Sequence, residues 1–122
     1  MNNKPKYTLF KNASYALDGL RHALKSETSF KIEVILALLL VPLIYLLPLA
    51  LGYKLILMVT YGLIMIAELL NSAVENVVDL VTQEIHPLAK AAKDIGATAV
   101  LFAVLLHLLC WLLIGIAYFQ LH

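Results

Sequence analysis

The sequence predicts an all-α membrane protein with one N-terminal amphipathic surface helix and three transmembrane helices. Of its 122 residues, 62% are hydrophobic and only 14% are charged, whereas soluble domains are about 45–50% apolar and about 25% charged. Three long apolar segments and a polar N-terminal stretch use nearly all of this length. We therefore expect a single membrane domain over residues 1–122, with no room for a second domain.

The first expected element is a surface helix over about residues 7–31. Apolar residues recur there at intervals of three and four, and charged residues occupy the other faces. A helix of this kind suits the membrane interface, where its Lys and Arg side chains can reach toward the headgroups. The pattern is not that of a cleaved signal peptide, so we expect the chain to be retained whole.

Three transmembrane helices are expected at about residues 34–51, 55–81 and 95–121. Pro42 and Pro48 are expected to kink or end the first of them. Residues 52–54 are then expected to form a very short turn before the second.

Several residues of the third transmembrane segment are expected to serve packing or anchoring. His107 is expected to form a hydrogen bond between helices, and Cys110, the single cysteine, to be a small buried apolar residue that forms no disulfide. Trp111, Tyr118 and Phe119 are expected at the membrane interface.

The distribution of positive charge predicts the orientation in the membrane. Only one of the nine Lys and Arg residues, Lys54, lies between the first two spans, and two, Lys90 and Lys93, lie between the second and third. The other six precede the first span: Lys4, Lys6, Lys11, Arg21, Lys25 and Lys31. Positive residues favour the cytoplasmic side. We therefore expect the N-terminus and the 82–94 loop in the cytoplasm.

A stripe of polar residues runs along the second transmembrane segment. Glu68, Asn71, Glu75 and Asp79 are spaced three, four and four residues apart, so they share one helix face. A carboxylate at bilayer depth costs at least about 2.5–3.5 kcal/mol, and such residues usually mark ion, proton or substrate chemistry. This face is therefore the expected functional site.

The spacing within the stripe favours two different roles for its acids. Glu68 and Glu75 lie about 10 Å apart along the helix axis, too far for both to hold one ion. Glu27, at the end of the surface helix, could converge with Glu75 on Mg²⁺, which commonly takes one or two carboxylates together with water and substrate phosphates. Glu68, at greater depth, suits a general base for a hydroxyl at the membrane surface. For Glu27, an ion pair with Lys31 one turn later remains an alternative.

The segment from 82 to 94 adds polar groups that could contact a nucleotide on the same side of the membrane: Glu84, His86, Lys90, Lys93 and Asp94. There is no GxxxxGK[ST] or GxGxxG motif, which excludes a standard glycine loop for phosphate. Ser/His/Asp catalysis, zinc-ligand spacing and HExxH are also missing from the sequence, and no basic cluster interleaved with aromatics suggests nucleic acid. By sequence alone, Lys93 could equally be a membrane anchor or a phosphate contact. A histidine such as His86 is more often an ordinary loop residue than a ligand, and Lys90 is expected to be a cytoplasmic anchor.

Three segments, ELLNSAVENVVDL (68–80), HPLAKAAKD (86–94) and GATAVL (96–101), resemble the signature of the prokaryotic diacylglycerol kinase family. The likeness extends more loosely over most of the chain, including YALDGLRHALKSETSFKIE (15–33). This resemblance implies an ATP-dependent, Mg²⁺-requiring lipid kinase in a bacterial inner membrane, which assembles as a homotrimer with active sites shared between subunits.

Carried over by position, the resemblance implies that Glu68 is the base for the lipid hydroxyl and that Glu27 and Glu75 hold the magnesium of ATP. Asn71, Asp79 and Arg21 would support the site or the substrate. Besides Glu27 and Glu75, the implied nucleotide contacts are Tyr15, Glu84, His86, Lys93 and Asp94. The chain departs from the family at three positions, with Thr8 where arginine is frequent and with Ala16 and Ala97 where serine is common.

Two alternatives remain at this stage. The related undecaprenol kinases use the same machinery, and HPLAKAAKD is more similar to that branch. The segment ETSFKIE (27–33), the long third span and the overall length favour diacylglycerol, with phosphatidic acid as product. From another class, a small oligomeric transporter could use Glu68 to bind a proton or cation. It explains less well why polar groups gather at one end and continue into the 82–94 loop.

Overall fold

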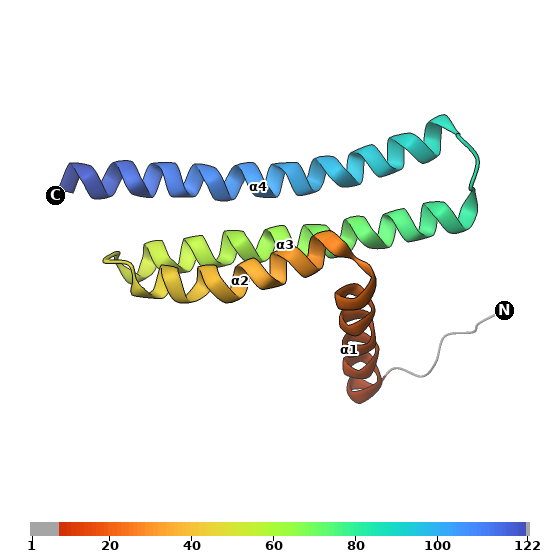
Figure 1. The fold of residues 1–122 in the computed structure, drawn as a ribbon, viewed down its shortest axis with the longest axis horizontal. Coiled ribbons are helices and arrows are strands. Elements are labelled where there is room, and N and C mark those ends of the chain that lie inside the picture. The colour runs from red at the N-terminus through yellow and green to blue at the C-terminus, as the bar shows by residue number, and fades with distance from the viewer. Residues whose placement is uncertain (1–7, 122) are drawn as a thin grey trace.

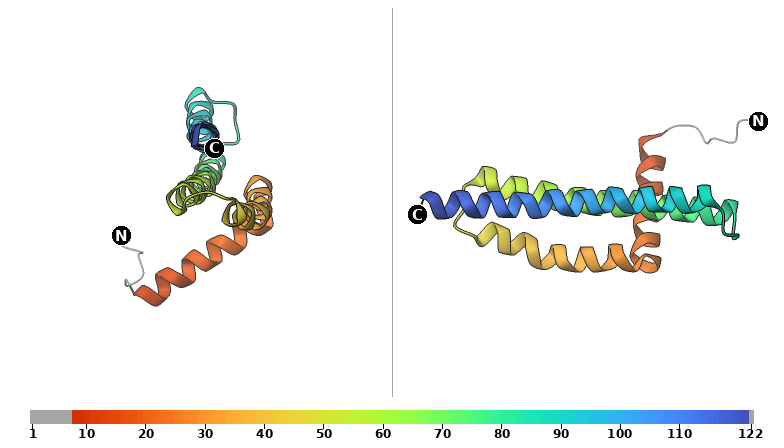
Figure 2. Two further views of the ribbon diagram at one scale, coloured as in Figure 1. Left: turned by 90° about the vertical axis from the view of Figure 1, so that its left-hand side faces the viewer. Right: turned by 90° about the horizontal axis from the view of Figure 1, so that it is seen from above.

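A computed structural model describes residues 8–121, and this part of the chain is helical without strands. The helices are α1 (Leu9–Ser26), α2 (Thr28–Leu46), α3 (Leu51–Val81) and α4 (Pro87–Leu121). Helix α4 packs along α3, and α2 packs against α3. These three run along one axis, whereas α1 projects from them at a steep angle (Figures 1 and 2). Lys4, Lys6 and Tyr7, which entered the predictions above, lie outside the described residues.

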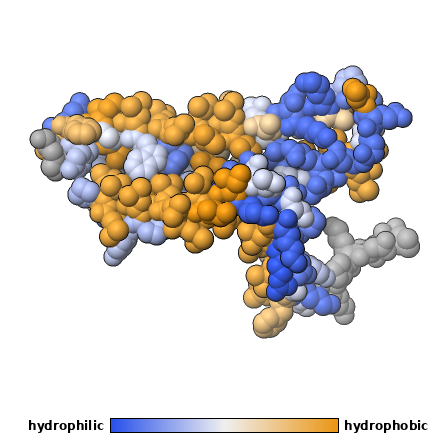
Figure 3. Space-filling model, viewed as in Figure 1, coloured by the Kyte–Doolittle hydropathy of each residue, from blue (hydrophilic) through white to orange (hydrophobic). Residues whose placement is uncertain are grey.

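Three of these helices are long and apolar enough to cross a membrane, as predicted. They are α2 with 19 residues, α3 with 31 and α4 with 35. Apolar residues cover most of the bundle surface, and hydrophilic residues gather along α1 and at the end that carries the α3–α4 loop (Figure 3). Leu38, Leu70 and Phe102, for example, are each more than three-fifths exposed. Side chains of this kind need lipid or other helices around them.

The predicted surface helix over 7–31 is wrong at its C-terminal end, because the chain turns at Glu27. This residue has an extended backbone, with φ −105° and ψ 100°. It ends α1 by donating its N–H to Ala23 O at 2.9 Å, and α2 begins at the next residue. Ser26, Thr28 and Ser29 compete with helical bonding through their own hydroxyls. Phe30, only 2% exposed, then anchors the first turn of α2.

The predicted turn at 52–54 is also wrong, since these residues belong to the first turns of α3. Helix α2 contains Pro42 and ends at Leu46, and Leu47 is extended with φ −66° and ψ 146°. A residue before proline avoids the helical region, so Pro48 places the turn four residues earlier than expected. Lys54 then reaches back to donate to Tyr45 O at 2.6 Å.

The third span begins at Pro87 rather than at residue 95, so the connection to α3 comprises only residues 82–86. Proline is favoured in the first turn of a helix, and the alanines and lysines that follow are strong helix formers. The polar segment 87–94, predicted as loop, is therefore held on a rigid helix that faces the end of α3.

The core of the single chain is small, and part of the α3–α4 contact is polar. Ile44, Leu57 and Ile114 form one buried apolar cluster. Nearby, His107 joins the two helices, because its Nδ1 lies 2.7 Å from Thr60 Oγ1. The prediction that His107 serves helix packing is confirmed.

The bonding pattern assigns the proton on His107. Trp111 Nε1–H, which can only donate, bonds His107 Nε2 at 2.9 Å. The imidazole is then neutral with its proton on Nδ1, which donates to Thr60 Oγ1. The Thr60 hydroxyl in turn donates to Ile56 O at 2.8 Å. Every polar atom of this link between α3 and α4 therefore has a partner.

Candidate functional site at the loop end of α3 and α4

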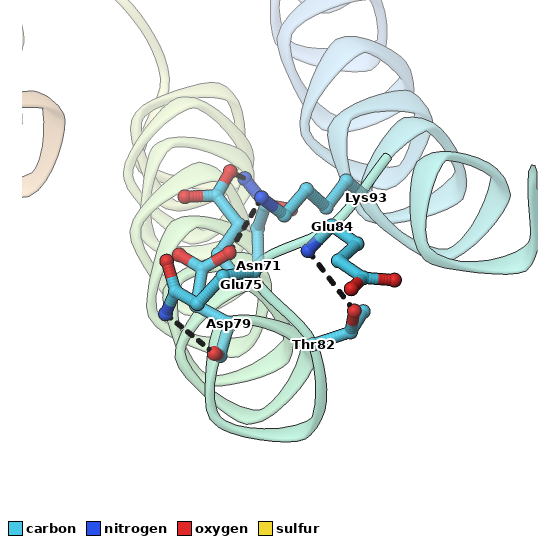
Figure 4. Close-up of polar contacts among 7 residues, drawn as sticks. Asn71, Glu75, Asp79, Thr82, Glu84 and Lys93 are labelled. Atoms are coloured by element: carbon cyan, nitrogen blue, oxygen red, sulfur yellow. Dashed lines mark hydrogen bonds and ion pairs between the residues drawn. The ribbon is translucent and has the colours of Figure 1, made fainter. Parts of the chain in front are cut away.

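The predicted polar stripe lies on α3 and continues to the loop end of the hairpin. Asn71 Nδ2 donates to Glu75 Oε1 at 3.0 Å, which is the contact expected for residues four apart on one helix face. Figure 4 shows Asn71, Glu75 and Asp79 following one another along this face. The amide therefore holds one oxygen of the Glu75 carboxylate and leaves the other available.

An ion pair links the stripe to α4. Lys93 Nζ lies 2.6 Å from Asp79 Oδ1 and reaches across from α4 to α3 (Figure 4). Lys90 pairs with Asp94 one turn later on α4, also at 2.6 Å. Both pairs are exposed, so they contribute little to stability. Their ammonium groups can therefore exchange a carboxylate for a phosphate at little cost.

Six of the polar residues named in the sequence analysis surround one open hollow of about 420 Å³ between the ends of α3 and α4: Asp79, Glu84, His86, Lys90, Lys93 and Asp94. The short loop is held by its own polar groups, since Thr82 Oγ1 accepts from the N–H of Glu84 at 3.1 Å. His86 Nδ1 accepts from the N–H of Leu88 at 3.1 Å and so caps the start of α4. His86 thus has a local structural role in addition to its place beside the hollow.

Glu27 lies apart from this hollow, in a crevice between α1 and α3. His22 and Ala23 of α1, together with Ser72 and Asn76 of α3, line the crevice with it. The sequence alternative of an ion pair to Lys31 is not found in residues 8–121. Glu27 instead sits at the corner between α1 and α2, half-buried and close to the turn of α3 that carries Glu75.

Two predicted residues of α1 are not brought to the other groups within one chain. Arg21 pairs with Asp18 at 3.4 Å on the exposed surface of the helix. Tyr15 is 53% exposed on the same helix. Within one chain, neither side chain lines the hollow between α3 and α4.

Glu68 has an acidic neighbour that the sequence reasoning missed. Glu33 of α2 and Glu68 lie within hydrogen-bonding reach of each other, and the negative charges of Glu75 and Glu27 also act on Glu68. One oxygen of Glu33, Oε2, is buried without a bonded donor in the structure. Two carboxyl groups can bond only when one carries a proton. Glu33 could have been recognised as a candidate from the sequence, because it is the last charged residue before the first apolar run.

The acids of the site match the donor chemistry of magnesium better than that of zinc or a cluster. Within residues 8–121, His, Cys, Asp and Glu do not form any group of three or more that could hold a metal ion by itself. Glu27 lines the α1–α3 crevice, and Glu75, bonded to Asn71, lies on the same turn of α3 as the crevice residues Ser72 and Asn76. Mg²⁺ needs only one or two such ligands when phosphates and water complete its shell.

Comparison with known proteins assigns the chain to a family. Residues 14–115 match the model of the prokaryotic diacylglycerol kinase family. A diacylglycerol kinase of Haemophilus influenzae is 41% identical over 104 residues, which cover 84% of this chain and 87% of the relative. That of Escherichia coli K12 is 38% identical over 111 residues, covering 90% and 91%. That of Pseudomonas aeruginosa is 38% identical over 97 residues, covering 80% and 79%.

The matched region contains the whole stripe on α3, the loop, the start of α4 and Glu27. The resemblance seen in the sequence is thus confirmed over most of its length. This chain belongs to the prokaryotic diacylglycerol kinase family.

Proposed function

We propose that this protein transfers the γ-phosphoryl group of ATP to the hydroxyl of diacylglycerol and so forms phosphatidic acid. The observation that carries the proposal is the family match over residues 14–115, which includes every acid of the stripe and the polar hollow beside it. Relatives from three bacteria that carry the name diacylglycerol kinase support the same lipid acceptor.

The position of α1 supports a site that spans the membrane surface. Helix α1 projects steeply from the bundle and meets α3 near Ser72 and Asn76 (Figure 1). With α1 as an amphipathic helix in the membrane interface, the rest of α3 beyond Asn76 extends about 8 Å into the water. Glu68 then lies about 6 Å on the bilayer side of Ser72. A water-soluble nucleotide and a membrane hydroxyl can meet between these levels.

The proposed roles of the site residues differ with their depth relative to the membrane surface. The hollow with Lys93, Glu84, His86 and Asp94 suits the nucleotide, because an ammonium supplies the counter-charge that a glycine loop would otherwise provide. Glu27 and Glu75 would hold magnesium, which supplies positive charge to the phosphates when bound.

Glu68 accepts the proton of the lipid hydroxyl, and Asn71 keeps Glu75 in place through its amide. The charge distribution favours a cytoplasmic position for this end of the molecule, where ATP is available.

A homotrimer completes the proposal. Within one chain, Glu27 lines a crevice separate from the hollow, and Tyr15 and Arg21 lie away from both. The transmembrane helices also leave most of their apolar surface uncovered. Association of subunits would cover part of this surface and bring α1 residues of one chain to the site of another.

Purified protein in lipid-containing micelles, supplied with ATP and Mg²⁺, tests the function. We expect diacylglycerol to become phosphorylated faster than undecaprenol. Equal or faster turnover of undecaprenol would move the protein to the other branch of the family. Absence of ATP consumption with either alcohol, together with cation flux across sealed vesicles, would favour the transporter.

A further inference from the structure

Gly96 of α4 faces the side chain of Asn71 on α3 more closely than any other glycine approaches a neighbour. A Cβ atom added to Gly96 would lie inside the van der Waals contact distance of Asn71 Oδ1 and 3.3 Å from Asn71 Cγ. At each of the other four glycines, an added Cβ would meet nothing within 4 Å. The space at Gly96 is therefore occupied by the amide of Asn71.

The orientation of that amide is determined by its other contact. Asn71 Nδ2 donates to Glu75 Oε1, and a carboxylate can only accept. The amide oxygen must therefore point the other way, toward Gly96, where it is buried and has no N–H or O–H donor. Only the Cα–H of a glycine fits against it, and such a group is a weak donor to oxygen.

We propose that Gly96 is a positioning residue of the kinase site, which keeps Asn71 bonded to Glu75 by leaving room for the amide oxygen. The inference rests on the proposed function, in which Glu75 holds magnesium-ATP. The contact also explains why Asn71 Oδ1 is buried without a conventional partner.

A methyl group at position 96 would overlap the amide oxygen of Asn71. Rotation of the Asn71 side chain removes this overlap at the lowest energetic cost, because the oxygen lies at the end of a flexible group. Rotation removes the Nδ2 donor from Glu75 and frees the carboxylate to take other rotamers. A displacement of about 1 Å in a group that positions substrate can reduce kcat/KM on the order of 10²-fold.

The test compares Gly96→Ala with Gly115→Ala, a matched change on the same helix where a Cβ has open space. Alanine forms helix better than glycine, so Gly115→Ala should leave the unfolding temperature unchanged or raise it. Gly96→Ala should lower it. Thermal unfolding in detergent measures both.

The same measurement on Asn71→Ala and on the double variant Asn71→Ala/Gly96→Ala isolates the contact. Once the Asn71 amide is removed, the methyl at 96 has room, so the second change should no longer lower the unfolding temperature. If Gly96→Ala alone fails to fold, recovery of folding in the double variant supports the contact equally. An undiminished penalty in the Asn71→Ala background would overturn the proposal.

Kinetics then test the positioning role separately from stability. Gly96→Ala should raise the apparent KM for magnesium-ATP more than it lowers kcat, while the KM for diacylglycerol stays near that of the unmodified protein. Activity like that of Gly115→Ala would refute the role of Gly96. If the unmodified protein phosphorylates no lipid, the proposed function fails, and the unfolding measurements still decide whether Gly96 and Asn71 are in contact.

Discussion

Single residues in this protein combine a local structural task with a place in the site. Thr8 caps α1 by accepting from the N–H of Lys11 at 3.1 Å. His86 caps α4 and also lines the hollow. Asn71 places its amide between Glu75 and Gly96. Such double roles mean that a substitution must be chosen to remove one function and leave the other intact.

Glu68→Gln tests whether the Glu68 carboxylate is the general base for the lipid hydroxyl. Glutamine keeps the shape and hydrogen bonding of the side chain, but its amide cannot act as a general base. Formation of phosphatidic acid should fall on the order of 10²-fold or more, while ATP binding and assembly are retained. A variant with near-normal turnover would remove Glu68 from the role of base, and one that fails to assemble would indicate a structural role.

Glu75→Gln is expected to act on the metal. Loss of one negative charge weakens a carboxylate site for Mg²⁺, so half-maximal activity should need a higher magnesium concentration. A magnesium titration of initial rates measures the shift, and Asp18→Asn on the exposed face of α1 provides a control. An active Glu75→Gln variant with the magnesium dependence of the unmodified protein would exclude Glu75 as a ligand.

At the scale of elements, the apolar runs and the polar stripe predicted the three long helices and the face of α3 that bears the site. The ends of the helices depended on local chemistry that periodicity does not report. The extended backbone of Glu27, the effect of Pro48 on Leu47 and the start of α4 at Pro87 each moved a boundary.

Contacts between helices were harder to predict. The proximity of Glu33 to Glu68 and of Gly96 to Asn71 depends on how α2 and α4 pack on α3. A single sequence carries no direct signal for that packing.

Thr60→Val tests the polar link between α3 and α4. The change removes the acceptor of His107 Nδ1–H, and hydrogen bonds between membrane helices contribute about 1 kcal/mol. The unfolding temperature should fall. Fluorescence should change too, because Trp111, bonded to His107, is the single tryptophan.

Thr98→Val is the matched control for this experiment. Thr98 Oγ1 makes the same kind of bond to the carbonyl four residues earlier, at 2.9 Å, but is exposed. Thr98→Val should therefore leave the unfolding temperature and the tryptophan fluorescence nearly unchanged. Equal effects of the two substitutions would show that the Thr60–His107 hydrogen bond contributes no stability beyond that of the bond from each threonine to its own helix.

The molecule as a whole has a polar hairpin tip at the α3–α4 loop and a mostly apolar surface along its three long helices. Most large apolar side chains of α2, α3 and α4 are exposed in the single chain. Assembly into a homotrimer is the proposed way to cover part of this surface and complete the site. Mass determination in detergent by light scattering should give three chains per particle, and a monomer with full kinase activity would contradict shared sites.

In the proposed site, a nucleotide at the hairpin tip and a lipid hydroxyl near Glu68 meet. The most direct measurement follows the γ-phosphoryl group of labelled ATP in proteoliposomes that contain diacylglycerol and the purified protein. We expect the label to appear in phosphatidic acid at a rate that depends on diacylglycerol and Mg²⁺, and we expect Glu68→Gln nearly to abolish the transfer. Release of the label only as inorganic phosphate, or no loss from ATP at all, would contradict the proposal.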